Sequence, residues 1–123
     1  MGSSAIGYTP VLGYVQTPDG TEDWLLNAVT NVGPTTIGFI VVNSFFSYSS
    51  GVYYDQDCSF SSPNYAGMHA VIVVGYGSDP SLGDYWIVRN SWNVGWGDQG
   101  YIKMARNKNN LCSLASWATY PTI

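Results

Sequence analysis

The chain has 123 residues, of which 46% are hydrophobic, 15% aromatic and only 10% charged. This length fits one compact domain, and the ten Tyr and five Trp argue against intrinsic disorder. The longest aliphatic run, Ala70 to Val74, is far shorter than the ~20 residues that a membrane helix requires, which argues against a membrane-spanning protein.

The formal net charge is −4, and the charges are unevenly placed. Residues 1–88 contain seven acidic side chains and no Lys or Arg, while all four cations lie in residues 89–123. Duplex binding typically uses about six to ten phosphate contacts, which four scattered cations do not supply. We therefore expect no nucleic-acid partner.

The first expected elements are an extended strand over residues 8–16 and a helix over residues 20–32. Asp19 and Glu22 have the spacing of a capping box at the helix start. Gly33-Pro34 ends the helix. Within the expected helix, five apolar residues fall on one face at helical spacing: Trp24, Leu25, Ala28, Val29 and Val32.

After the helix the pattern becomes that of a β protein. Strands are expected over residues 35–42, 51–54, 69–76, 85–90, 101–105 and 118–123. Between them lie a helical turn or loop at 43–50, a polar loop at 55–67, a hairpin loop at 77–84, an irregular turn at 91–100 and a turn at 107–110. The sequence thus predicts an α+β fold, an antiparallel sheet or barrel with one main helix.

Two cysteines, Cys58 and Cys112, leave two interpretations open. An even count in an aromatic-rich, Lys-poor domain favours one disulfide in an oxidising compartment, although two cytosolic thiols would give the same sequence. The first residues, Met1 to Ser4, have neither the basic nor the apolar region of a signal peptide. We expect them to be an artificial start or the cut end of a longer chain.

Few residues are candidates for chemistry. His69 is the only histidine, which excludes a multi-histidine metal site, and two cysteines are too few for a Cys-rich zinc site. Gly75 and Gly77 follow a strand but precede a hairpin, whereas a dinucleotide fingerprint needs a helix there. We therefore predict no metal and no cofactor.

His69 begins one expected strand, and Asn90 ends the next strand across the hairpin. Two antiparallel strands joined in this way bring the start of one beside the end of the other. The Asn90 amide oxygen could then accept from one imidazole nitrogen and leave the other as a base. Taken alone, a single His at a strand edge is more often a structural residue, and a single Asn at this position is more often a turn residue.

Several strings occur in an order and spacing that narrow the choice. They are MHAVIVVGYG at 68–77, YWIVRNSW at 85–92, GWGDQGY at 95–101, NLCSLAS at 110–116 and Tyr120-Pro121, with GVYY at 51–54 ahead of Cys58. Together they closely resemble the C-terminal half of papain-family cysteine peptidases, the cathepsin L branch most. The resemblance covers essentially the whole chain and implies one domain, residues 1–123, with the barrel-like right-hand domain of that fold.

The resemblance implies a role for each matching position. His69 would be the catalytic base and Asn90 would orient it, while Trp92 and Trp96 would wall the leaving-group side of the cleft. Cys58 and Cys112 match the disulfide positions of this half.

Two further positions would contact substrate. Met68 stands where the family usually has Asp or Asn before the histidine. Trp117 stands where cathepsin L-like enzymes usually have a small residue, at the floor of the second substrate subsite. The alternative is that Trp117 fills the local core.

The family nucleophile lies in a Cys-Gly-Ser-Cys-Trp string, which neither Cys58 nor Cys112 matches. A base without a nucleophile cannot cleave a peptide bond by this mechanism. We therefore expect the chain to be inactive alone, and to depend on a Cys-bearing N-terminal domain or to self-associate. The resemblance also implies protein or peptide substrates for the parent enzyme and a lysosomal or extracellular location.

Two alternatives remain open. The chain could be a non-enzymatic papain-like module that acts as a decoy or binds a partner. Without the family resemblance, it could also be a secreted β module that binds carbohydrate through Trp and Tyr faces.

Overall fold

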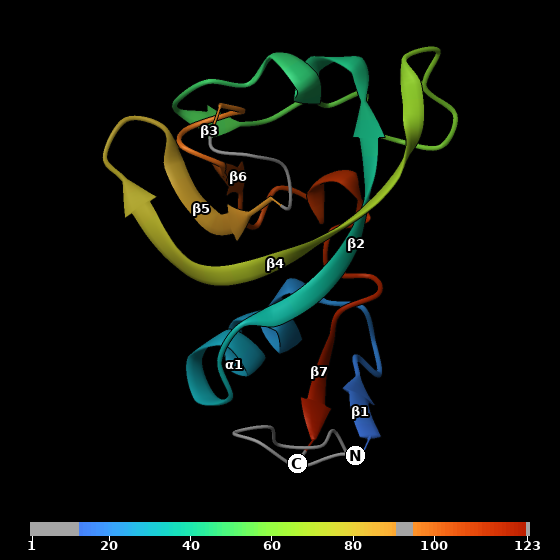
Figure 1. The fold of residues 1–123 in the computed structure, drawn as a ribbon, viewed down its shortest axis with the longest axis vertical. Helices are drawn as coiled ribbons and strands as arrows, with labels where there is room; N and C mark the ends of the chain where they lie inside the picture. Colours follow the sequence, from blue (N-terminus) through green and yellow to red (C-terminus); the bar gives the residue numbers. More distant parts are fainter. Residues whose placement is uncertain (1–12, 91–94, 123) are drawn as a thin grey trace.

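A computed structural model describes residues 13–90 and 95–122. Its seven strands form one sheet in the order β1-β7-β2-β4-β5-β6-β3, with the long strand β4 in the middle (Figure 1). The elements are β1 (Gly13–Gln16), α1 (Glu22–Asn31), β2 (Thr35–Val42), the 3₁₀ helix η1 (Asn43–Ser47), β3 (Val52–Tyr53), β4 (Tyr65–Asp79), β5 (Gly83–Arg89), β6 (Tyr101–Ala105), the 3₁₀ helix η2 (Leu111–Ser113) and β7 (Thr119–Thr122). The predicted α+β class, a β domain with one main helix, is confirmed.

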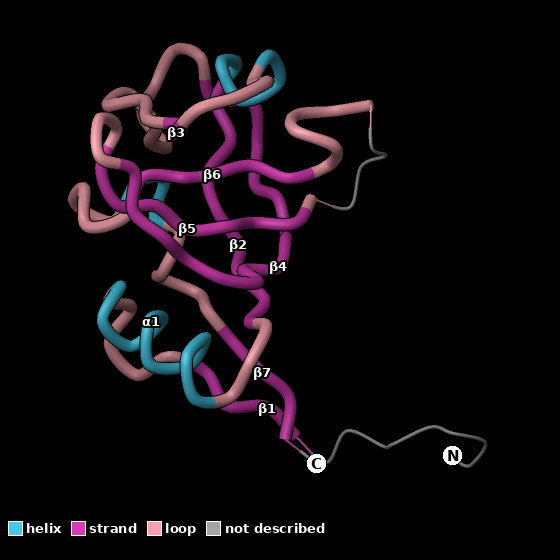
Figure 2. Tube along the Cα trace, turned by 90° about the vertical axis from the view of Figure 1, so that its left-hand side faces the viewer, coloured by secondary structure: helices cyan, strands magenta, loops and turns pink. Residues whose placement is uncertain are grey.

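Helix α1 lies with β1 and β7 at one end of the molecule (Figure 2). It buries Leu25 and Ala28, as the apolar spacing predicted. The predicted cap at Asp19 is wrong, because Thr21 is the N-cap and its hydroxyl accepts from the Trp24 amide. Asp19, two residues before the N-cap, instead accepts from the backbone N–H and the hydroxyl of Thr21 and so holds the capping residue in place.

Strand β4 is longer than the predicted strand 69–76, because the hairpin is tighter than expected. Its ladder with β5 continues to the pair Asp79–Gly83, which leaves only residues 80–82 as the turn. The Asp79 carboxylate accepts from the amides of Ser81 and Leu82, and these hydrogen bonds lower its pKa. Gly83 has φ +92°, a conformation that favours glycine.

Ile40 and Val42 are buried on one face of β2, and a second part of the core lies on the opposite face of the curled sheet. Register pairs on this face join Ile37 to Val71, Val73 to Val88 and Trp86 to Met104, and all six side chains are buried. One strand departs from the predicted antiparallel pattern, since β3 pairs with β6 in parallel. Among the described residues, 13–90 and 95–122, no helix is long and apolar enough to cross a membrane.

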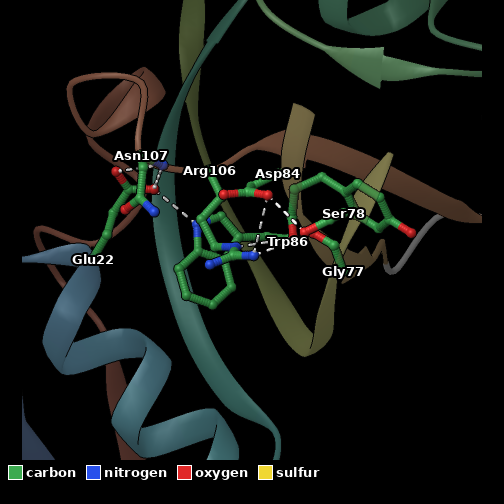
Figure 3. Close-up of polar contacts among 8 residues, drawn as sticks. Glu22, Gly77, Ser78, Asp84, Trp86, Arg106 and Asn107 are labelled. Atoms are coloured by element: carbon green, nitrogen blue, oxygen red, sulfur yellow. Dashed lines mark hydrogen bonds and ion pairs between the residues drawn. The ribbon is translucent and has the colours of Figure 1, made fainter. Parts of the chain in front are cut away.

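A polar network joins the start of the helix to the β4–β5 hairpin (Figure 3). The Arg106 guanidinium donates to the Gly77 carbonyl and lies over the rings of Tyr76 and Trp86. Trp86 in turn donates its indole N–H to the Glu22 carboxylate at 2.8 Å. The network therefore fixes the end of β6 and the start of α1 against one buried tryptophan.

Candidate functional site

The predicted pair of His69 and Asn90 is brought together by the β4–β5 hairpin. The imidazole Nε2 of His69 lies 2.8 Å from the Asn90 amide oxygen. Because that oxygen only accepts, the proton on Nε2 donates to it. A neutral imidazole protonated at Nε2 carries its lone pair on Nδ1, the atom that can act as a base.

Both residues are held by packing from the sheet. His69 lies opposite Phe39 in the β2–β4 register, and the edge of one ring meets the other at a centroid distance of 6.1 Å. Asn90 is 4% exposed, and its backbone N–H donates to the Gly100 carbonyl at 3.0 Å. A half-buried imidazole thus faces a buried amide whose backbone is fixed.

Trp96, predicted to wall the cleft, rests on the aromatic side chains around η1. Its ring lies 4.9 Å from that of Phe45 and 6.1 Å from that of Tyr48, and its N–H donates to the Phe46 carbonyl. Burial raises the pKa of the Tyr48 hydroxyl, which donates to the Gly51 carbonyl. Trp92, the other predicted wall residue, lies outside the described residues.

Met68 and Trp117, predicted to contact substrate, are 46% and 41% exposed. The alternative that Trp117 fills the core is therefore wrong, since its indole lies at the surface against Phe60, 6.3 Å between ring centroids. Sequence reasoning missed Phe60 and its neighbour Tyr65. The available signal was an aromatic residue placed among serines at 59–62.

The predicted disulfide is present. Cys58 and Cys112 are bonded, with Cα atoms 4.9 Å apart across a sequence separation of 54 residues. The bond joins the loop before β4 to η2. Both cysteines of the 123 residues are thereby used, and neither is a free thiol.

Nearly the whole chain matches one known protein family. The model of the papain family cysteine proteases matches residues 3–122, and the chain belongs to that family. Within it the chain is cathepsin L-like, and its fold is the right-hand domain of papain-like enzymes.

Individual relatives agree with this placement. The chain is 50% identical over 112 residues to a cathepsin L-like protein of Caenorhabditis elegans, covering 90% of this chain and 32% of the relative. It is 45% identical over 121 residues to cathepsin L of Sarcophaga peregrina, covering 98% and 34%.

A solved structure shares the fold. Digestive procathepsin L 3 of Tenebrio molitor larval midgut superposes with a TM-score of 0.82 at 43% identity, covering 94% of this chain and 36% of that one. The chain thus spans about a third of the length of the curated relatives it matches.

Proposed function

We propose that this chain supplies the base half of a cysteine endopeptidase site, with His69 as general base and Asn90 as the residue that orients it. The observation that carries the proposal is the 2.8 Å contact between His69 Nε2 and the Asn90 amide oxygen. That contact stabilises the ring tautomer with its lone pair on Nδ1, as an Asp does in serine triads.

The proposed reaction divides its groups between two segments of protein. A cysteine thiol outside these 123 residues gives its proton to His69 Nδ1, and the thiolate attacks the peptide carbonyl carbon. The imidazolium then protonates the leaving amine, and water hydrolyses the remaining thioester. Because Cys58 and Cys112 are bonded to each other, the chain alone has no nucleophile for the first step.

The test is complementation with a Cys-bearing N-terminal domain of a cathepsin L-like protease, followed with a fluorogenic dipeptidyl substrate. We expect no turnover from the chain alone and turnover from the mixture. His69→Ala should reduce the rate of the mixture by about 10²–10⁴-fold, and Asn90→Ala by less. Asn27→Ala, on the exposed side of α1, is the matched control and should leave the rate unchanged.

A rate unaffected by His69→Ala, with the variant folded and bound to its partner, would contradict the assignment of the base. Turnover by the isolated wild-type chain would contradict the need for a second domain.

The partner surface that we propose is an apolar row along β4. Met68, Ile72 and Val74 lie at alternating positions of the strand and are 37–46% exposed. Such a row favours contact with an N-terminal Cys-bearing domain or with a second copy of the chain. Proteins and peptides are the proposed substrates, and a lysosomal or extracellular location is proposed from the disulfide and the cathepsin relatives.

The same row supports a second candidate, a non-enzymatic papain-like module that binds a partner or acts as a decoy. The complementation experiment separates the two. Tight association with the N-terminal domain but no turnover would favour the module, whereas turnover that depends on His69 would favour the peptidase.

A further inference from the structure

Three exposed aromatic side chains form a cluster on the surface of the molecule. Phe60 is 57% exposed, Tyr65 40% and Trp117 41%. Phe60 lies between the other two, with ring centroids 5.7 Å from Tyr65 and 6.3 Å from Trp117. We call these three residues the aromatic cluster.

The disulfide links the two chain segments that carry Phe60 and Trp117. Phe60 follows Cys58 by two residues, and Trp117 follows Cys112 by five. Because the two cysteines are bonded, the loop that carries Phe60 and the segment that carries Trp117 are tied at their bases. The segments that carry Phe60 and Trp117 are thereby kept close to each other.

A β-bulge places Tyr65 on the same face of β4 as Met68. The register of β2 and β4 shifts between Val41 and Val42, so that Tyr65 lies opposite Val42 while Met68 lies opposite Ile40. Val42 and Ile40 point to the same face of the sheet, so Tyr65 and Met68 share that face as well. His69 directly follows Met68 and lies opposite Phe39, so its side chain points to the other face of the same strand.

We infer that Phe60 is a positioning residue for substrate specificity, acting through Trp117. This inference rests on the proposed function and on the role that the family resemblance implies for Trp117, the floor of the second substrate subsite. The Phe60 ring blocks the indole on one side and holds it where it shortens that subsite. The subsite then accepts Ala, Gly or Val at the second substrate residue and rejects the larger Leu and Phe.

The test uses the complemented enzyme and paired substrates that differ only in Val or Leu at that residue. Phe60→Ala should relax the preference for Val over Leu by about tenfold, chiefly through a lower KM for the Leu substrate. Phe60→Tyr, which keeps the ring, should retain the preference. Leu82→Ala removes a side chain of similar exposure, 54%, in the β4–β5 turn and should change nothing.

A double-mutant cycle separates positioning from a general structural effect. In a Trp117→Ala background, which should itself admit Leu, Phe60→Ala should cause no further change in the preference. An equal effect of Phe60→Ala in both backgrounds would overturn the inference that it acts through Trp117.

A second readout needs no activity. Acrylamide quenching of Trp117 in the isolated chain, taken as the difference between wild type and Trp117→Phe, should increase when Phe60 becomes Ala. Unchanged quenching overturns the positioning role. Absence of turnover with both substrates overturns the proposed function instead, whereas turnover with unchanged preference in Phe60→Ala overturns only the role of Phe60.

Discussion

Glu22 is a single carboxylate that accepts hydrogen bonds from three residues in two parts of the chain, β5 and the loop after β6. Its oxygens accept from the buried indole N–H of Trp86 at 2.8 Å and from the backbone amides of Asn107, at 3.1 Å, and Asn110, at 3.3 Å (Figure 3). Asn107 and Asn110 both have positive φ, so the loop adopts a left-handed conformation that directs its amides at the carboxylate. One side chain at the start of α1 thus sets the shape of a loop 85 residues away.

We expect Glu22→Ala to lower the free energy of unfolding by about 2–3 kcal/mol, because it leaves the Trp86 indole N–H without an acceptor in the interior. Glu22→Gln should cost less, since its amide oxygen still accepts. Asp23→Ala, the other acid in the first turn, is the control and should cost at most about 1 kcal/mol through the helix dipole. Denaturation in urea measures all three, and equal losses for Glu22 and Asp23 would contradict the role of the carboxylate.

At the scale of elements, η1 and β3 are joined to β6 by buried tyrosine hydroxyls. Tyr48 donates to the Gly51 carbonyl at 2.6 Å and accepts from the Lys103 amide at 3.3 Å. Tyr53 shares a hydrogen bond with Ser44. Burial raises the pKa of both Tyr48 and Tyr53 above its usual value.

These shifts predict how stability depends on pH in the alkaline range. Above about pH 10 the unfolded chain loses its tyrosine protons while the folded state still holds those of Tyr48 and Tyr53. Unfolding is therefore favoured as pH rises, and the stability present below pH 10 is lost. As pH is raised from about 9 to about 11, the denaturant concentration at the unfolding midpoint should decrease, and it should decrease less steeply in Tyr53→Phe. The control is Tyr14→Phe, which changes a side chain that is 75% exposed and should behave as wild type.

Elements with a strong local pattern were predictable from the sequence. The β-branched run Thr35–Val42 and the strand Tyr101–Ala105 have the predicted bounds. The parallel pairing of β3 with β6 was not predictable, because a strand of two residues carries no partner information in its own sequence.

The candidate site likewise has a part that was predictable from the sequence and a part that was not. Hairpin geometry allowed His69 and Asn90 to meet, and the resemblance to the family implied both their pairing and the disulfide. The aromatic cluster was not predictable, since it depends on how a disulfide and a bulge bring three distant segments together.

For the molecule as a whole, the apolar row on β4 is the surface that we expect to cause self-association in solution. Antiparallel sheets commonly leave one face to solvent with polar side chains on it, whereas the exposed side chains of this central strand are apolar. In register, Ile72 lies between Thr36 of β2 and Arg89 of β5, so one substitution there reaches the middle of this surface.

We expect the isolated chain to self-associate at high concentration and Ile72→Asp to reduce that association, because a charge at the centre of the row opposes burial. Leu82→Asp changes an equally apolar, 54% exposed side chain outside the row and serves as the control. Sedimentation velocity over a range of concentrations measures both. A wild-type chain that stays monomeric throughout would contradict this role for the row.

The Cys58–Cys112 bond places the proposed peptidase under two opposed redox demands. A cysteine nucleophile on the partner works only as a reduced thiolate, whereas the cystine that underlies the aromatic cluster must stay oxidised. Cys112 is 3% exposed and Cys58 half-buried, which slows attack by an external thiol on the bond. Burial thereby gives the cystine kinetic protection, so that a mildly reducing medium can maintain the nucleophile while this half of the site keeps its shape.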